Sequence, residues 1–206
     1  MVGDIKGRNV KLETFKSAMR QINSGKNPYI KKEDGMQQDI SSPVEERMLR
    51  EKAYTEYLDE LIINARNNGT LRMLDSYLQD ENVREAIVQA YTEGDANNQI
   101  SKEEAEAAAA KASERVKKID NIYQNEIIHA SDIADKVADK KGVSLPAEYV
   151  QMIASANVRH RLNLERYDEV AALYNEDTER IKQVVGEKLD SVIDYQGMIS
   201  LKTTIQ

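Results

Sequence analysis

Residues 102–141 read KEEAEAAAAKASERVKKIDNIYQNEIIHASDIADKVADKK, and apolar side chains recur along them every three or four positions. That interval places these side chains on one face of an α-helix. The face consists of Ala105, Ala109, Ala112, Val116, Ile119, Tyr123, Ile127, Ala130, Ala134 and Val137. Ser101 and Glu104 form a capping box before the stretch, and Gly142 is a stop signal after it. We therefore expect one unbroken helix over 102–141, about 60 Å long at the usual rise per residue.

The first six of these residues hold a heptad register, the pattern by which a helix supercoils against another helix. Continuing that register beyond Tyr123 would place Glu126 in the apolar face. A step of four residues to Ile127 avoids the charge and introduces a stutter, which locally unwinds a supercoil. We predict the stutter. We also predict that the part of this face from Ala105 to Ala130 is an interface with another helix.

A second helical region is predicted from Pro146 to about Tyr195. Its apolar positions follow one heptad pattern, formed by Val150, Ile153, Leu164, Tyr167, Ala171, Tyr174, Ile181 and Val185. Polar residues at Asn157, His160 and Thr178 weaken this pattern, so a break is expected near 155–157 or near Asn175. Residues 141–144 would fold the region back on 102–141. The predicted fold is all-α, an elongated helical bundle with a long antiparallel helical hairpin and extended terminal segments.

The preceding part of the chain is predicted to contain shorter helices over 10–23, 43–68, 71–79 and 81–92. Ser42, Pro43 and Glu45 mark the start of the second of these, and Gly69 marks its end. Residues 24–42 lack a periodic stripe and are interpreted as an extended strap, and 196–206 as a tail or a strand donated to a neighbour. The predicted organisation is a basic helix and strap (1–42), a short-helix region (43–100), the long hairpin (101–195) and the tail (196–206).

The composition favours a thin helical protein over an enzyme. Of 206 residues, 32% are charged and 40% hydrophobic, with no Trp and one Phe, so the bulky side chains of a compact catalytic core are scarce. There is no Cys, and the two histidines, His129 and His160, do not fall in a metal-ligand spacing. We expect no catalytic residues, no membrane span and no signal peptide, and a cytoplasmic or virion location.

Positive charge is concentrated at the N-terminus. Residues 1–32 contain eight basic residues and two acidic ones, although the whole chain has a net charge of −7. A basic arm on an acidic body suits contact with nucleic acid or with an acidic partner surface. The alternative is a solvated terminus that keeps the protein soluble.

Residues 93–104, EGDANNQISKEE, resemble the calcium-binding EF-hand loop. The resemblance places Asp95 and Asn97 at the third and fifth positions, the carbonyl of Gln99 at the seventh and Glu104 at the twelfth, and implies that these residues bind Ca²⁺. Two positions depart from the pattern, because Glu93 replaces the first Asp and Asn98 replaces the sixth Gly. The alternative is an ordinary acidic connection that ends in the Ser101 cap.

The long helices and terminal extensions favour a non-catalytic structural or assembly protein that contacts other subunits, as a homo-oligomer or in a larger complex. In this style the chain resembles helical virion proteins of tailed bacteriophages, such as neck, ring or internal cargo proteins. The resemblance implies a virion component. A calcium-binding interaction module is the alternative.

Overall fold

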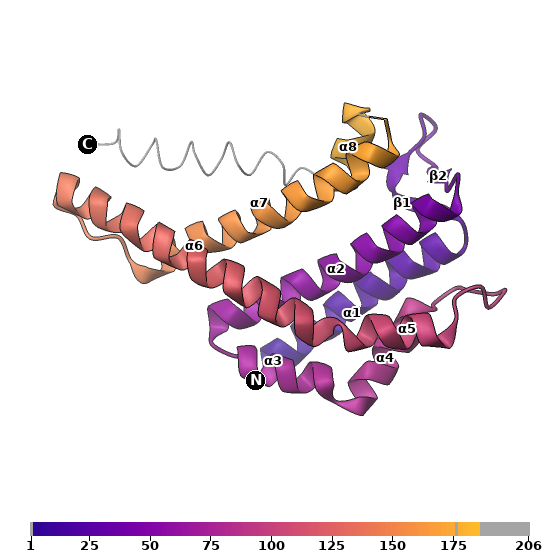
Figure 1. The fold of residues 1–206 in the computed structure, drawn as a ribbon, viewed down its shortest axis with the longest axis horizontal. Helices are drawn as coiled ribbons and strands as arrows, with labels where there is room; N and C mark the ends of the chain where they lie inside the picture. The colour runs from indigo at the N-terminus through magenta and orange to yellow at the C-terminus, as the bar shows by residue number, and fades with distance from the viewer. Residues whose placement is uncertain (1, 176, 186–206) are drawn as a thin grey trace. The chain divides into compact units, whose positions relative to one another are not determined.

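The computed structural model describes residues 2–175 and 177–185, and it is all-α as predicted (Figure 1). The helices are α1 (Val2–Asn23), α2 (Pro43–Asn68), α3 (Leu71–Gln79), α4 (Glu81–Tyr91), α5 (Lys102–Ala110), α6 (Ala112–Lys141), α7 (Ala147–Leu173) and α8 (Thr178–Val185). The chain forms two compact units, Met1–Lys118 and Ile119–Gln206, which are called the N-terminal and C-terminal units below. Among the described residues, no helix is both long and apolar enough to cross a membrane.

Capping residues set most helix boundaries where the sequence predicts them. The Ser42 hydroxyl accepts the Glu45 amide at the start of α2, and Gly69 ends that helix with a left-handed φ of 70°. Asp80 caps α4, and Ser101 accepts the Glu104 amide before α5. Helix α1 begins at Val2, earlier than the predicted residue 10.

Helix α2 is the central element of the N-terminal unit. Its buried residues lie all around the helix, because α1 and α3 pack on it and other elements reach its polar side chains. The Phe15 ring of α1 stacks on Tyr57 with ring centroids 5.0 Å apart, and Tyr54 meets Tyr91 of α4 edge to face. Burial raises the pKa of both Tyr54 and Tyr57.

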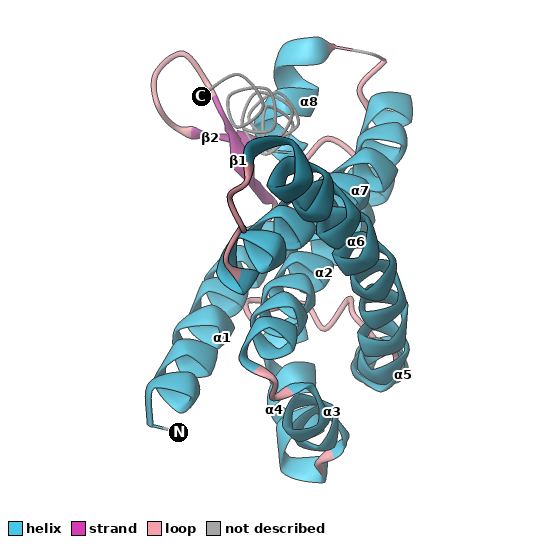
Figure 2. Ribbon diagram, turned by 90° about the vertical axis from the view of Figure 1, so that its left-hand side faces the viewer, coloured by secondary structure: helices cyan, strands magenta, loops and turns pink. Residues whose placement is uncertain are grey.

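Residues 24–42 form a β-hairpin, so the predicted strap is wrong. Strand β1 (Lys26–Lys31) pairs antiparallel with β2 (Gln37–Asp39) and packs on α1 (Figure 2). The turn contains Gly35, with a φ of 80°, and the Asp34 carboxylate accepts the Met36 amide. The ladder is irregular between its two ends, and its buried residues lie three positions apart rather than two. That irregularity removes the alternation by which a strand is predicted.

The predicted single helix over 102–141 is interrupted at Lys111, which separates α5 from α6. The Tyr54 hydroxyl donates to the Ala108 carbonyl at 2.7 Å, and the Lys111 amide donates to the carbonyls of Ala107 and Ala108. A side chain that bonds to a carbonyl of the helical ladder is a recognised cause of a helix break. The break therefore depends on α2, which is distant in the sequence.

In the C-terminal unit, α7 turns back after the connection at 142–146 and crosses α6 at an angle (Figure 1). Gly142 ends α6 with a φ of 65°, as predicted. The chain breaks again after α7, where Asn175 adopts a left-handed φ of 53°, so the predicted break near that residue is confirmed. Leu164, predicted to lie in the apolar seam, is 46% exposed. The predicted tail, 196–206, lies outside the described residues.

Candidate functional site

The residues predicted as a helix interface are largely interior residues of this chain. Of the eight predicted positions, those buried are Ala105, Ala109, Ala112, Val116, Ile119, Tyr123 and Ala130. Ile127 is only half-buried. Helix α5 packs on α4, which covers part of the alanine stretch. These side chains are therefore covered by this chain itself and do not form an exposed surface.

Glu126 occupies the seam position that the sequence analysis assigned to its neighbour Ile127, so the predicted stutter is misplaced. Glu126 is 4% exposed, and the next buried positions are Ala130 and Ala134, which moves the doubled step of four residues further along α6. Two side chains of α7 reach the carboxylate. The Asn157 amide donates to it at 2.7 Å, and Nε of Arg161 lies 2.7 Å from its other oxygen. These partners offset the cost of burying the charge, so the heptad register continues through it.

The loop that resembles an EF-hand has its helices in place, since α4 precedes it and α5 follows it. Asn98, at the position of the usual glycine, adopts a left-handed φ of 51°. The Asp95 carboxylate, however, accepts the amides of Gln99 and Ile100 at 3.0 and 2.8 Å, and Glu104 lies 3.6 Å from Arg50. Among the described residues, no group of three or more His, Cys, Asp or Glu is placed to hold a metal ion.

The basic N-terminal region is folded into the N-terminal unit as α1 and β1. Arg20 pairs with Glu93 at 3.2 Å, Lys26 pairs with Asp39, and the Arg8 guanidinium lies 4.8 Å from the centre of the Tyr77 ring. The Lys26 hydrogen bond and charge hold the pKa of the Asp39 carboxyl below its usual range. Much of the local positive charge therefore has an acidic or aromatic partner within the same chain.

Buried charges of α2 are held by side chains from several other elements. Asp59 accepts two hydrogen bonds from Arg115, at 2.7 and 3.0 Å. Arg50 donates to Asn23 of α1 at 3.2 Å, and the Lys52 ammonium lies 3.7 Å from the centre of the Tyr29 ring. Such pairs position elements with respect to one another. These contacts are structural, because each charged group is bound to another side chain of the same chain.

Within the described part of the chain, neither histidine forms an ion pair with another side chain. His129 is exposed on α6, and His160 is half-buried on α7. Burial lowers the pKa of His160, and its Nδ1 is buried without a hydrogen-bond partner among the described residues. A general base needs a positioned partner for its proton within hydrogen-bond reach.

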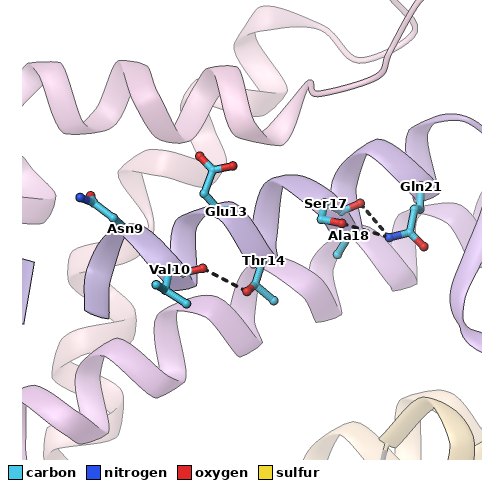
Figure 3. Close-up of a pocket in the computed structure, with 7 residues that line it drawn as sticks. All are labelled: Asn9, Val10, Glu13, Thr14, Ser17, Ala18 and Gln21. Carbon is cyan, nitrogen blue, oxygen red and sulfur yellow. Dashed lines mark hydrogen bonds between the residues drawn. The ribbon is translucent and has the colours of Figure 1, made fainter. Parts of the chain in front are cut away.

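A shallow groove runs along the outer side of α1 (Figure 3). It is lined by Asn9, Val10, Glu13, Thr14, Ser17, Ala18 and Gln21. The Thr14 hydroxyl donates to the Val10 carbonyl at 3.0 Å, so it turns back onto its own helix. At 100° per residue, five of these residues (10, 14, 17, 18 and 21) fall within about 100° of the helix circumference, and none of the five is charged.

Comparison with known proteins gives no match. No family model, no curated protein and no solved structure is similar to this chain. The function is therefore argued from the geometry alone.

The sequence analysis missed the α1 groove, although its signal is present in the sequence. Positions 10, 14, 17, 18 and 21 carry small or neutral side chains in a chain that is 32% charged. The apolar stripe through Phe15 and Met19 identifies only the buried face of the helix, and the groove lies on the exposed face. A stretch without charge on the exposed side of an amphipathic helix is the observation that identifies this surface.

Proposed function

We propose that this chain is a non-catalytic structural protein that works by contacting other subunits through helix surfaces, first of all a second copy of itself. The observation that supports the proposal is the stripe of uncharged residues along the centre of the α1 groove. A solvated helix face in so highly charged a protein normally carries Lys, Glu, Asp or Arg, whereas the centre of this groove carries Val10, Thr14, Ser17 and Ala18.

A second copy can meet this face through its own α1. The centre of such a contact would contain the uncharged residues Val10, Thr14, Ser17 and Ala18, so no charge of α1 would be buried there. Small side chains on α1 also let a second helix approach closely. A two-fold axis through the middle of the groove would pair α1 with α1 of the other copy, the self-complementary contact found in most homodimers.

The proposal extends to the setting in which such a protein acts. The style of the sequence, with long helices and terminal extensions, supports a component of a larger assembly, such as a phage virion, in the cytoplasm or in the particle. The buried carboxylates of Asp59 and Glu126 support a structural role, since each pairs with an arginine from another helix.

The test is the mass of the protein in solution, measured by light scattering after gel filtration and by native mass spectrometry. We expect a dimer or larger ring for the wild type and a smaller mass for Val10→Glu. Val44→Glu is the matched control, because Val10 and Val44 are both 60% exposed but only Val10 lies in the groove. A wild type that remains a monomer across the concentration range, alone and in native extract, would rule out the proposal.

A calcium-binding interaction module is the second candidate, and Asn98 is the observation in its favour. Its left-handed backbone is the conformation that an EF-hand loop requires at the sixth position. Binding would require Asp95 and Glu104 to exchange their present partners for the ion. Calorimetric titration with calcium decides the matter, since no heat of binding at a large excess eliminates this candidate.

A further inference from the structure

A small cavity lies where the first turns of α1 meet the last turns of α2, within the N-terminal unit. Its volume is about 250 Å³. Leu61 and Ala65 of α2 and Leu74 of α3 form its apolar wall, and all three are at most 6% exposed. The start of α1 also reaches α3, since the Arg8 guanidinium lies over the Tyr77 ring (Figure 1). The cavity is therefore enclosed by three helices of one chain.

The polar side chains around this cavity are hydrogen-bond donors, and the charged ones are positive. They are Arg8 and Lys11 of α1 and Asn64 and Asn68 of α2. Among the described residues no Asp or Glu lines the cavity, although the chain contains 36 acidic and 29 basic residues. Two cations that are surrounded by amides rather than carboxylates leave their charge available to an anion.

The two cations are held differently. The Arg8 guanidinium lies 4.8 Å from the centre of the Tyr77 ring, and a guanidinium stacked in this way can donate hydrogen bonds from its edge. Lys11 also borders a neighbouring cavity that is lined by Glu56 and Glu60, but it pairs with neither carboxylate. Among the described residues, no other ion pair or hydrogen bond engages the Lys11 ammonium. The cavity therefore combines a positioned guanidinium with an ammonium that can turn toward a ligand.

Gly7, which also lines the cavity, is a second and independent observation. A glycine inside a helix is destabilising relative to alanine. Gly7 does not have a left-handed φ, and a Cβ added to it would meet nothing within 4 Å, so neither the backbone nor the packing requires glycine there. A local preference that is broken without a structural reason is typical of a functional position. A larger side chain at this position would occupy space that glycine leaves open.

The C-terminal end of α2 lies at the cavity, and its negative end of the helix dipole is too weak to exclude an anion. The Gly69 amide donates to the Arg66 carbonyl at 3.3 Å, and the Thr70 amide donates to the Ala65 carbonyl at 2.8 Å. A helix end carries about half a negative charge, whereas Arg8 and Lys11 together carry two positive charges. The electrostatic balance at the cavity therefore favours an anion.

The size and the charge of the cavity together indicate the kind of anion. Its volume lies below the roughly 300 Å³ at which pockets for drug-sized ligands begin, so the ligand is small. A phosphate group carries about −1.5 to −2 charge at pH 7, which two cations balance. The arginine fork matches the geometry of phosphate oxygens, and the Asn64 and Asn68 amides supply further donors.

We propose that this cavity binds the phosphate group of a small ligand, either inorganic phosphate or a short phosphate monoester, with Arg8 and Lys11 as the anion-binding residues. The apolar wall contacts the carbon atoms of a monoester. This goes beyond the proposed function and does not rest on it, since the cavity is formed within one chain.

Calorimetric titration of the full chain with inorganic phosphate, at constant ionic strength, tests the site. We expect saturable binding of one phosphate per chain, and Lys11→Gln should weaken it by about tenfold or more because a charge-assisted hydrogen bond is lost. Lys16→Gln is the matched control, since it also removes a positive charge from α1 but Lys16 pairs with Glu13 at 3.6 Å and does not line the cavity. No saturable binding at a large excess of phosphate, or equal weakening in the two variants, would overturn the proposal.

Gly7→Leu tests the cavity without changing any charge. Leucine has a higher helix propensity than glycine, so the variant should fold, which circular dichroism checks, and its side chain should fill the cavity and abolish phosphate binding. Phosphate binding that survives in the folded variant would contradict the proposal.

Competition with a duplex oligonucleotide, at the same concentration of phosphate groups, identifies the source of the phosphate. We expect the duplex not to displace inorganic phosphate, because the cavity is small and enclosed by three helices. Displacement by the duplex that Lys11→Gln removes would show that the site takes a nucleic-acid backbone, and it would overturn the assignment to a small ligand.

Discussion

Replacing Glu126 with leucine is expected to leave the C-terminal unit as stable as the wild type or more stable, although it removes an ion pair whose carboxylate is buried. Leucine suits the seam position, which lies between Tyr123 and Ala130 on the buried side of α6. Glu126 is the buried member of this pair and Arg161 the exposed one, so Glu126→Leu removes the charge that has been taken out of water and leaves no buried charge behind. Arg161, whose side chain is 55% exposed, can turn to solvent when its partner is removed.

Removing a partner of Glu126 while keeping its carboxylate should destabilise the protein. Breaking a fully buried pair from one side costs about 3–5 kcal/mol, but water reaches this pair through the exposed guanidinium. We therefore expect Arg161→Leu to lower the free energy of unfolding by about 1–3 kcal/mol. Asn157→Leu should lower it by about 1–2 kcal/mol, because one hydrogen bond to a buried charge is lost.

Urea denaturation followed by circular dichroism measures these differences at neutral pH. Because the chain has two compact units, two unfolding transitions can be observed. The transition whose midpoint shifts in the variants of Glu126, Asn157 and Arg161 is assigned to the C-terminal unit. Asn125→Leu, an exposed position on α6, controls for the addition of a leucine to this helix. The reasoning is refuted if Glu126→Leu destabilises the protein as much as Arg161→Leu does.

Three further predictions concern the rest of the chain. Gly94→Ala should lower the free energy of unfolding by about 3 kcal/mol and Gly69→Ala by about 1 kcal/mol, measured by denaturation. Both glycines have a positive φ, but only at Gly94 would the new Cβ lie 2.9 Å from a backbone carbonyl oxygen of α1. Tyr54→Phe should cost about 1 kcal/mol by thermal denaturation, the value of the lost hydrogen bond to Ala108, and an unchanged midpoint would contradict our account of the helix break. Because the pKa of His160 is lowered in the folded protein, the unfolded chain takes up its proton first as the pH falls. The stability that is present above about pH 6.5 is therefore lost as the pH falls through the folded pKa. His160→Gln should lose less stability than the wild type between about pH 7 and pH 5 in the same denaturation experiment.

Helix boundaries could be predicted from the sequence because they depend on local chemistry. Ser42, Asp80 and Ser101 cap the amides of their own helices, and Gly69 and Gly142 adopt the left-handed conformation that ends a helix. These interactions involve residues within a few positions of one another. The pattern of residue types alone is then sufficient to locate them.

Features that depend on distant residues could not be predicted. The break at Lys111 depends on the hydroxyl of Tyr54, which is 54 residues from its acceptor Ala108. Burial of Glu126 depends on Asn157 and Arg161, which belong to another helix. Nothing in the sequence around Glu126 shows that these partners are opposite it, so a rule that excludes charge from the seam gives the wrong position.

The β-hairpin and the candidate surfaces illustrate a different limit. The Asp34–Gly35 turn is a hairpin signal in the sequence, but the irregular ladder hides the strands on either side of it. The α1 groove is visible as a stretch of uncharged positions, yet the sequence does not show whether the rest of the chain covers it. Exposure is a property of the folded molecule. Leu164 and Ile153 belong to the same predicted seam, but Leu164 is exposed and Ile153 is buried.

The pairing of Asp59 with Arg115 has a consequence for how the protein is made. The two residues are 56 positions apart, so α2 leaves the ribosome well before the guanidinium that neutralises its buried carboxylate. Until the first turns of α6 emerge, the nascent chain can place α1 and the hairpin beside α2 but cannot bury Asp59 against its final partner. The N-terminal unit should therefore reach its native state late in translation, and ribosome-bound chains that stop before residue 115 should remain sensitive to protease.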